Sequence, residues 1–226
     1  YRPLNIDYDR YVTIKNHLRK LKYNPKKVYK SSFFNVVDVG FNSIFLKANK
    51  DLVTLLDKFN FNKTKINNYI KLTEKNFLKL YDKKKESFFS KDIRNNQKIF
   101  IPSITNYFVL FADLNNDKIN KKLIKSLKKY NPKNKYFFSS IKPNHKSFEE
   151  KRYWRGPVWI NCNWLIHKGL KNKDKFFSEK IKKKTIQILE KKGFFEYFSC
   201  KNGKPMGAKN FSWSAALYLD LKLNKN

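Results

Sequence analysis

The stretch RYWRGPVWINCNWL, residues 152–165, carries three of the four tryptophans of the chain and two of its six arginines. Lysine supplies nearly all of the remaining positive charge, so arginine is scarce elsewhere. Flat aromatic rings beside fixed hydrogen-bond donors suit the apolar faces and hydroxyl groups of a sugar, or an organic cation. The same rings would also fill a hydrophobic core, and their spacing alone leaves both interpretations open.

A second aromatic stretch lies near the C-terminus, with GFFEYFS at residues 193–199 and NFSWSAALYLDL at residues 210–221. Most of the 18 acidic residues lie among lysines, whereas Glu196 lies between aromatic residues. A buried carboxylate without a partner is costly, so it must accept hydrogen bonds, pair with a cation or be retained for chemistry. From the residues alone, Glu196 belongs either to a structural ion pair or to a carbohydrate-cleaving pocket walled by the two stretches.

The composition indicates a folded protein of one or two domains, because 41% of the 226 residues are hydrophobic and 17% are aromatic. The formal net charge of +33 has two interpretations: a surface for nucleic acid or another polyanion, and a general preference for lysine at exposed positions. We favour the second, because lysine is spread over every segment and arginine, which makes bidentate contacts with bases, is rare. We therefore expect a small carbohydrate partner, with nucleic-acid binding as the alternative.

The two cysteines, Cys162 and Cys200, form no disulfide framework, and neither has metal-ligand spacing with the three histidines. The sequence therefore predicts no metal and no cofactor, and it indicates a reducing compartment such as the cytoplasm. No apolar run approaches the roughly 20 residues of a membrane span, so we expect no membrane partner. Nothing in the sequence sets the oligomeric state.

Apolar residues recur at helical spacing along most of the chain, which predicts an all-α fold. The predicted helices cover residues 1–23, 38–60, 62–82, 103–114, 117–130, 161–169, 174–192 and 211–223. Asp38 is the expected N-cap of the second helix and Gly169 the expected C-cap of the sixth. Antiparallel helix pairs with aromatic and acidic residues in the longer loops fit an α/α toroid, or part of one.

The connections between these helices carry three further predictions. Residues 24–32 are expected to form a loop, and a small β-hairpin is expected near residues 86–101, where the period changes. The segment KNGKPMGAKN, residues 201–210, is expected to form a turn with no strand before it, so it is not a phosphate-binding loop.

Several segments together resemble the signature blocks of glycoside hydrolase family 63. They are closest to its bacterial branch, the mannosylglycerate and glucosylglycerate hydrolases, and the likeness covers nearly the whole chain in the expected order. The matching segments are YWRGPVWIN (153–161), GFFEYF (193–198), FSWSAAL (211–217), Arg2-Pro3, DYDRY (7–11), VDVGFN (37–42) and IPSI (101–104).

The resemblance implies an (α/α)6 barrel, with residues 1–226 forming one catalytic domain of an inverting hydrolase that acts on a small α-glycoside such as glucosylglycerate or mannosylglycerate. Glu196 falls on the family's general base, which deprotonates the attacking water. The positions that match the family's substrate-binding residues are Tyr153, Trp154 and Trp159 for the sugar, and Arg2 and Tyr8 for the carboxylate of the aglycone. A guanidinium fork is a suitable partner for that carboxylate, and Arg155 is expected to orient Glu196 or its own loop.

One departure from the family pattern concerns the general acid. The family's acid is an aspartate in a Gly-Met-Asp-Asn-Ser-Pro-like block upstream of the Arg-Pro segment, and this chain contains no such block. We therefore expect an N-terminally truncated C-terminal part of the barrel, or a second chain that supplies the other part. Without the acid the chain alone is expected to be slow or inactive, and a sugar-binding remnant without catalysis is a further alternative.

Overall fold

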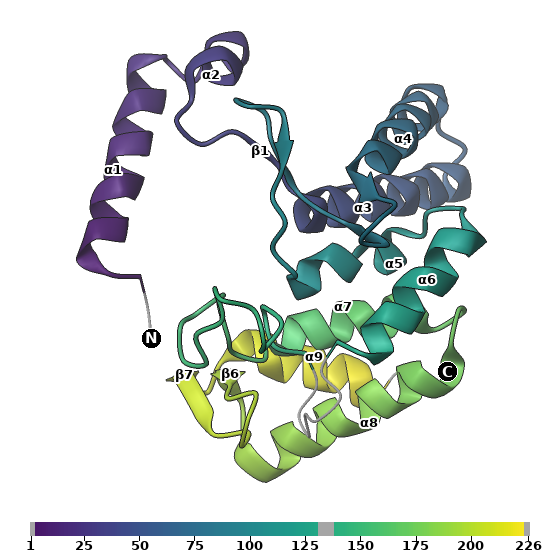
Figure 1. The fold of residues 1–226 in the computed structure, drawn as a ribbon. Coiled ribbons are helices and arrows are strands. Elements are labelled where there is room, and N and C mark those ends of the chain that lie inside the picture. The colour runs from purple at the N-terminus through teal and green to yellow at the C-terminus, as the bar shows by residue number, and fades with distance from the viewer. Residues whose placement is uncertain (1–2, 131–137, 224–226) are drawn as a thin grey trace.

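The computed structural model describes residues 3–130 and 138–223, and in these ranges the chain is mainly helical (Figure 1). Its helices are α1 (Asn5–Lys20), α2 (Pro25–Ser31), α3 (Val39–Lys58), α4 (Thr64–Phe77), α5 (Val109–Ala112), α6 (Asp117–Lys128), α7 (Ile160–Leu170), α8 (Lys175–Lys192) and α9 (Ser212–Leu223), with the 3-10 turns η1 (Leu78–Leu80) and η2 (Ile104–Tyr107). The strands are β1 (Val36–Val37), β2 (Tyr81–Asp82), β3 (Ser87–Phe88), β4 (Lys91–Asp92), β5 (Gln97–Lys98), β6 (Phe195–Phe198) and β7 (Pro205–Lys209). The helical fold class predicted from the periodicity is confirmed at this level.

Asp38 is the N-cap of α3, as predicted. One of its carboxylate oxygens accepts a hydrogen bond from the backbone N–H of Phe41 at 2.7 Å, which satisfies a donor that the first helical turn leaves free. The other oxygen accepts from the hydroxyl of Ser90 at 3.0 Å. Asp38 therefore both starts α3 and attaches it to Ser90, in the link between β3 and β4.

The loop predicted for residues 24–32 is wrong, because α2 lies there. The side chain of Asn24 accepts a hydrogen bond from the backbone of Lys27 at 3.1 Å, and Pro25 occupies the first helical position. Both are helix-start signals. The segment has no apolar stripe that would mark it as a helix, and none of the residues of α2 is buried.

Gly169 is not a C-cap, since α7 continues to Leu170. A Cβ atom at Gly169 would lie 2.6 Å from the backbone nitrogen of Phe111, which is too close for any side chain. Glycine is therefore needed here for packing, because it lets α7 approach α5 backbone to backbone.

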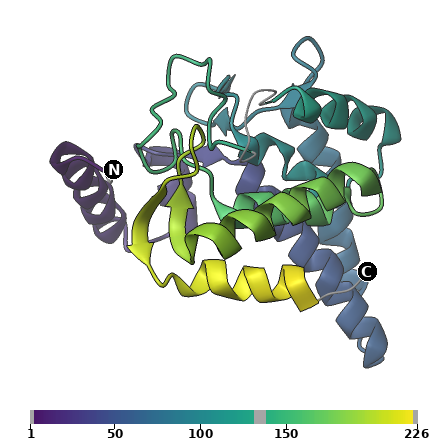
Figure 2. The ribbon, with the colours of Figure 1, turned by 90° about the horizontal axis from the view of Figure 1, so that it is seen from below.

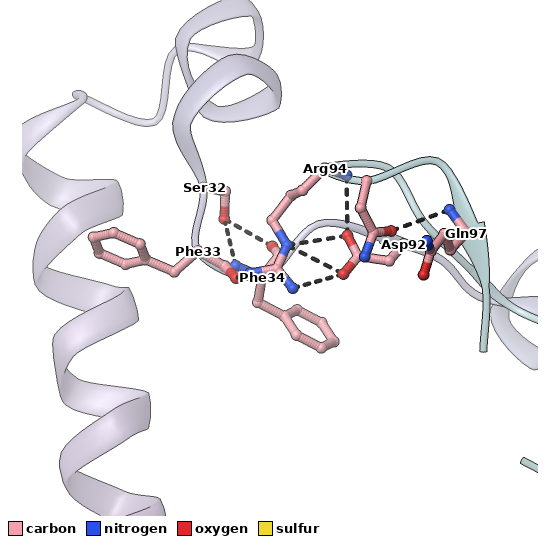
Figure 3. Close-up of polar contacts among 7 residues, drawn as sticks. Ser32, Phe33, Phe34, Asp92, Arg94 and Gln97 are labelled. Carbon is pink, nitrogen blue, oxygen red and sulfur yellow. Dashed lines mark hydrogen bonds and ion pairs between the residues drawn. The ribbon is translucent and has the colours of Figure 1, made fainter.

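The hairpin expected near residues 86–101 is confirmed as β4 and β5, in which Lys91 pairs with Lys98 and Asp92 with Gln97. β1 pairs with the other edge of β4, so the three strands form one sheet in the order β1-β4-β5. In the turn, the guanidinium of Arg94 contacts the carboxylate of Asp92 at 2.6 Å and donates to the backbone oxygen of Phe33 (Figure 3). Arg94 thus fastens the hairpin to the segment that precedes β1.

The pair β6–β7 was not predicted, and the expectation that no strand precedes residues 201–210 is wrong. The two strands are antiparallel, with Phe195 opposite Lys209 and Tyr197 opposite Met206. The register shifts between Phe195 and Tyr197, so Glu196 lies at an irregularity of the strand. Such bulges re-aim side chains and are frequent beside active sites.

The hydrophobic core lies between α3, α5 and α7, and α4, α6 and α8 carry further layers around it. α5 is short but buried, with Val109 and Leu110 fully enclosed, and burying each such side chain stabilises the fold by roughly 1.5–3 kcal/mol. α8 and α9 pack beside α7 (Figure 2). α1 has no buried residue and stands away from this body in both views.

None of the helices in the described ranges combines the length and the apolar character needed to cross a bilayer.

Candidate active site

Glu196 on β6 is buried, with 5% of its surface exposed. One carboxylate oxygen accepts a hydrogen bond from the hydroxyl of Tyr153 at 3.0 Å, and the other accepts from the backbone N–H of Ala208 on β7 at 3.1 Å. These two donors come from separate segments of the chain. The carboxylate is therefore held in a defined orientation rather than being free to rotate.

The close approach of β7 to this carboxylate depends on Gly207. A Cβ atom at this position would lie 2.6 Å from Oε2 of Glu196 and 2.7 Å from the ring of Tyr197. The backbone also has a φ of +76°, a conformation that glycine adopts without strain. The sequence shows Gly207 only as part of a turn, so its role beside Glu196 was not predicted.

Aromatic rings pack against the ring of Tyr153, whose hydroxyl contacts Glu196. Trp154 stacks on Trp159 with ring centres 4.1 Å apart and planes inclined by 6°, and the ring of Tyr153 meets both indoles edge-on. Trp159 is buried in the core, and its ring N–H donates to the backbone oxygen of Tyr153 at 3.0 Å. Trp154, in contrast, is 43% exposed, so it presents an indole surface to solvent. The core interpretation therefore holds for Trp159, whereas Trp154 is only partly covered by the protein.

Two cavities adjoin this cluster. One, of about 380 Å³, is mainly apolar and is lined by Trp154 and Trp213 together with Asp38 and Asn161. The side-chain oxygen of Asn161 is buried and has no hydrogen-bond partner among the described residues. The other, of about 880 Å³, lies between the loop before Tyr153 and the β6–β7 hairpin, next to Gly207. Ring surfaces with a few polar groups are typical of small-molecule sites.

Arg155 acts within its own loop. Its guanidinium donates to the backbone oxygen of Ser147 at 3.0 Å and pairs with the carboxylate of Glu149 at 2.7 Å. Of the two roles expected for this arginine, these contacts favour orientation of the loop.

The two residues expected to hold an aglycone carboxylate are placed differently. Arg2 lies outside the described residues. Tyr8 is on α1 and is about half exposed, with its ring beside that of Tyr11. The adjacent residue, Asp7, pairs with Arg152 at 3.0 Å, which attaches α1 to the segment that precedes Tyr153. The structure therefore brings Tyr153, Trp154, Trp159 and Glu196 into one cluster, whereas Tyr8 is exposed on α1.

In the described ranges, no group of three His, Cys, Asp or Glu side chains is arranged to hold a metal ion. The thiol of Cys162 lines the smaller cavity, but burial raises its pKa to about 12, so it is an unreactive thiol at neutral pH. The chemistry available in this cluster is that of an oriented carboxylate beside an exposed indole. Carboxyl groups are the acid and base of glycoside hydrolysis and a flat ring suits the apolar face of a sugar, so this combination is compatible with a carbohydrate site.

Comparison with known proteins gives the family. Residues 1–214 match the mannosylglycerate hydrolase MGH1-like glycoside hydrolase domain, and the chain belongs to this family. The mannosylglycerate hydrolase of Thermus thermophilus is 34% identical over 219 residues, which cover 96% of this chain and 53% of that protein. Mannosylglycerate hydrolase MGH1 of Selaginella moellendorffii is 30% identical, with coverages of 96% and 45%.

Solved structures agree with this assignment. The glycoside hydrolase family 63 mannosylglycerate hydrolase from Thermus thermophilus, in complex with Tris and D-glycerate, superposes with a TM-score of 0.92 at 34% identity, covering 96% of this chain and 54% of that one. Neutral trehalase Nth1 from Saccharomyces cerevisiae shares the fold at a TM-score of 0.67 and 16% identity, with coverages of 84% and 38%. The chain thus spans about half the length of the curated relatives it matches.

Proposed function

We propose that this chain is the base-carrying part of an inverting glycoside hydrolase that acts on a small α-glycoside, glucosylglycerate or mannosylglycerate. The observation that carries the proposal is the buried carboxylate of Glu196, oriented by the hydroxyl of Tyr153 beside the exposed indole of Trp154. The names of the family and of its relatives, which include a glucosylglycerate hydrolase from Mycolicibacterium hassiacum at 23% identity, support the substrate class.

In the proposed mechanism, Glu196 is the general base. An inverting glycosidase uses two carboxyl groups about 6.5–9.5 Å apart, one to protonate the leaving oxygen and one to activate water on the opposite face of the sugar. Glu196 would take the proton from that water, while Tyr153 and the N–H of Ala208 keep its oxygens in place. The general acid is proposed to come from polypeptide outside these 226 residues.

The substrate is proposed to lie across the aromatic cluster. The exposed face of Trp154 would cover the apolar face of the sugar, with Tyr153 and Trp159 behind it. The unpartnered side-chain oxygen of Asn161, in the cavity that Trp154 lines, is available to a sugar hydroxyl. Arg2 and Tyr8 are the proposed partners of the glycerate carboxylate.

We further propose that residues 1–226 form one domain, the C-terminal part of an (α/α)6 barrel, in a protein of the cytoplasm. The likeness to the Thermus enzyme over about half of that chain supports the barrel. The two buried cysteines that form no disulfide are compatible with a reducing compartment.

The test uses α-glucosyl and α-mannosyl fluoride, because fluoride leaves without help from a general acid. We expect this chain to hydrolyse at least one of them to the inverted β-sugar, as followed by NMR. Glu196→Gln should lower the rate by about 10²–10⁴-fold, because it removes a positioned base. The control is Glu190→Gln, a change at an exposed glutamate that pairs with Lys222 at 2.8 Å.

Equal rates in the Glu196→Gln variant and the unmodified chain would overturn the assignment of the base, and an α-configured product would overturn inversion. Calorimetry with glucosylglycerate and mannosylglycerate separates a further case. Binding without turnover of either fluoride would identify a sugar-binding protein instead of a hydrolase.

A further inference from the structure

The loop that presents Tyr153 folds back on itself between residues 149 and 156, and we call it the Tyr153 loop. The backbone N–H of Glu149 donates to the oxygen of Arg155 at 3.0 Å, and the N–H of Arg152 donates back to the oxygen of Glu149 at 3.0 Å. A Cβ atom at Gly156 would lie 2.0 Å from that same oxygen. The two ends of the loop are therefore in direct backbone contact, and only glycine fits at the crossing.

The backbone of Tyr153 has a φ of +22°, which is a strained conformation for a residue with a side chain. Such strain costs on the order of 1–3 kcal/mol and persists only where the surroundings over-determine it. Two hydrogen bonds help to hold this conformation. The hydroxyl of Tyr153 donates to Glu196, and the backbone oxygen of Tyr153 accepts from the indole N–H of Trp159. Neither of these contacts involves the tip of the loop before Tyr153.

The tip is held by Glu150. One carboxylate oxygen accepts the hydroxyl hydrogen of Ser199 at 2.5 Å, and the other pairs with the ammonium of Lys201 at 3.1 Å. Ser199 is buried, and its oxygen also accepts from the backbone N–H groups of Lys201 at 3.2 Å and Asn202 at 3.3 Å. The Ser199 hydroxyl, followed by Lys201, lowers the pKa of Glu150, so the charged form makes these contacts at neutral pH.

We infer that Glu150 is a positioning residue, a clasp that keeps the Tyr153 loop on the β6–β7 hairpin so that the hydroxyl of Tyr153 stays on Glu196. Ser199 follows β6 directly, and Glu196 lies within it, so the loop and the strand are joined at two points three residues apart. Loss of the contact between Glu150 and Ser199 would allow the strained backbone of Tyr153 to relax. The hydroxyl of Tyr153 would then move away from Glu196. The inference rests on the proposed role of Glu196 as the base.

The first experiment measures amide hydrogen exchange and does not depend on activity. In Glu150→Ala, the amides of Glu149, Arg152 and Arg155 should exchange about tenfold faster, the effect expected from losing a charge-assisted hydrogen bond. Amides of α7 and α8 should be unchanged. The matched control is Glu86→Ala, which removes a glutamate paired with Lys122 at 2.5 Å in the β2–β3 turn. Unchanged exchange in the loop would overturn the clasp, and so would an equal increase across α7 and α8.

The second experiment measures turnover of the α-glycosyl fluorides. We expect Glu150→Ala to lower kcat about tenfold with a smaller change in KM, since it misplaces the base without removing the sugar surface. Glu150→Gln keeps a hydrogen-bond acceptor and should lose less. Combined with Tyr153→Phe, Glu150→Ala should cause no further loss, because it acts through that hydroxyl. Additive losses would overturn the inference. If the unmodified chain turned over neither fluoride, the proposed function would fail, while the exchange result would still decide the clasp.

Discussion

At the scale of single residues, the geometry around Glu196 depends on the lack of a side chain at Gly207 as much as on the two hydrogen-bond donors to the carboxylate. Gly207 lets β7 pass within hydrogen-bonding distance of the carboxylate, so that the next residue, Ala208, can donate its N–H. Any larger residue at 207 must displace either Glu196 or the ring of Tyr197. The arrangement of the proposed base is therefore sensitive to one methyl group.

Gly207→Ala should accordingly reduce turnover by about 10²-fold, the effect expected from moving a catalytic group by about 1 Å. Part of any loss would come from backbone strain at positive φ. Gly203→Ala is the matched control, because Gly203 lies in the same hairpin with a φ of +69°. The rates at which the two variants hydrolyse the glycosyl fluorides distinguish the steric contact with Glu196 from the effect of backbone strain. Equal losses in both would show that the proximity of Gly207 to Glu196 is unimportant.

At the scale of elements, α7 and α8 are joined by a buried polar contact. Nδ1 of His167 lies 2.8 Å from the hydroxyl of Ser178 and 3.1 Å from its backbone oxygen, and the same hydroxyl donates to the backbone oxygen of His167 at 2.8 Å. Both residues are buried. Although a serine beside a histidine suggests a nucleophile and its base, this pair joins two packed helices within the core.

Burial lowers the pKa of His167 below its usual value of 6.5, so acid should destabilise this helix pair. As the pH falls below about 6.5, the unfolded chain binds a proton at this histidine before the folded chain does. The stabilisation is therefore complete above pH 6.5 and declines below it. Urea unfolding at pH 7.5 and 5.5 should show a smaller pH difference for His167→Gln, whose side chain stays neutral at both. An identical pH difference in the two proteins would contradict this.

The elements also show how far the sequence predicts the structure. α3 was predictable because a capping aspartate precedes a long apolar stripe, and both signals are local. The strand β6 was not, because FFEYF places aromatic residues on both faces and so lacks the apolar–polar alternation that marks a strand. Gly169 was assigned to a helix end because its actual reason, the backbone of α5, is distant in sequence.

The candidate site likewise contains residues that the sequence marks and residues that it does not. Residue type marked Glu196, Tyr153 and Trp154, since a lone acid among rings and a cluster of tryptophans stand out in a lysine-rich chain. Glu150 and Ser199 carry no such signal, because in a sequence a glutamate beside lysine and a serine before a turn cannot be told from ordinary surface residues. Only their 2.5 Å contact in the folded chain gives them a role.

At the scale of the whole molecule, one face of α3 lies in the core, and the apolar stripe along its opposite face is exposed to solvent. Val39 and Leu46 are fully buried, whereas the large side chains on the other side of the helix are exposed. These exposed residues are Phe41, Ile44, Phe45, Leu52, Leu55 and Phe59. Soluble monomers rarely expose a contiguous apolar surface of this kind. The sequence predicted this stripe, but it could not show that the described residues of this chain leave it exposed.

This exposed face should bind a hydrophobic dye such as anilinonaphthalene sulfonate while the chain is folded. Phe41→Glu combined with Phe45→Glu should reduce the dye fluorescence with little change in the thermal midpoint, because exposed side chains usually contribute within about 0.5 kcal/mol of stability. Phe88→Ala is the opposite control: Phe88 is fully buried, so its removal should lower the midpoint strongly, at about 3–5 kcal/mol. If the double variant lost as much stability as Phe88→Ala, the face of α3 would be part of the core and not a surface.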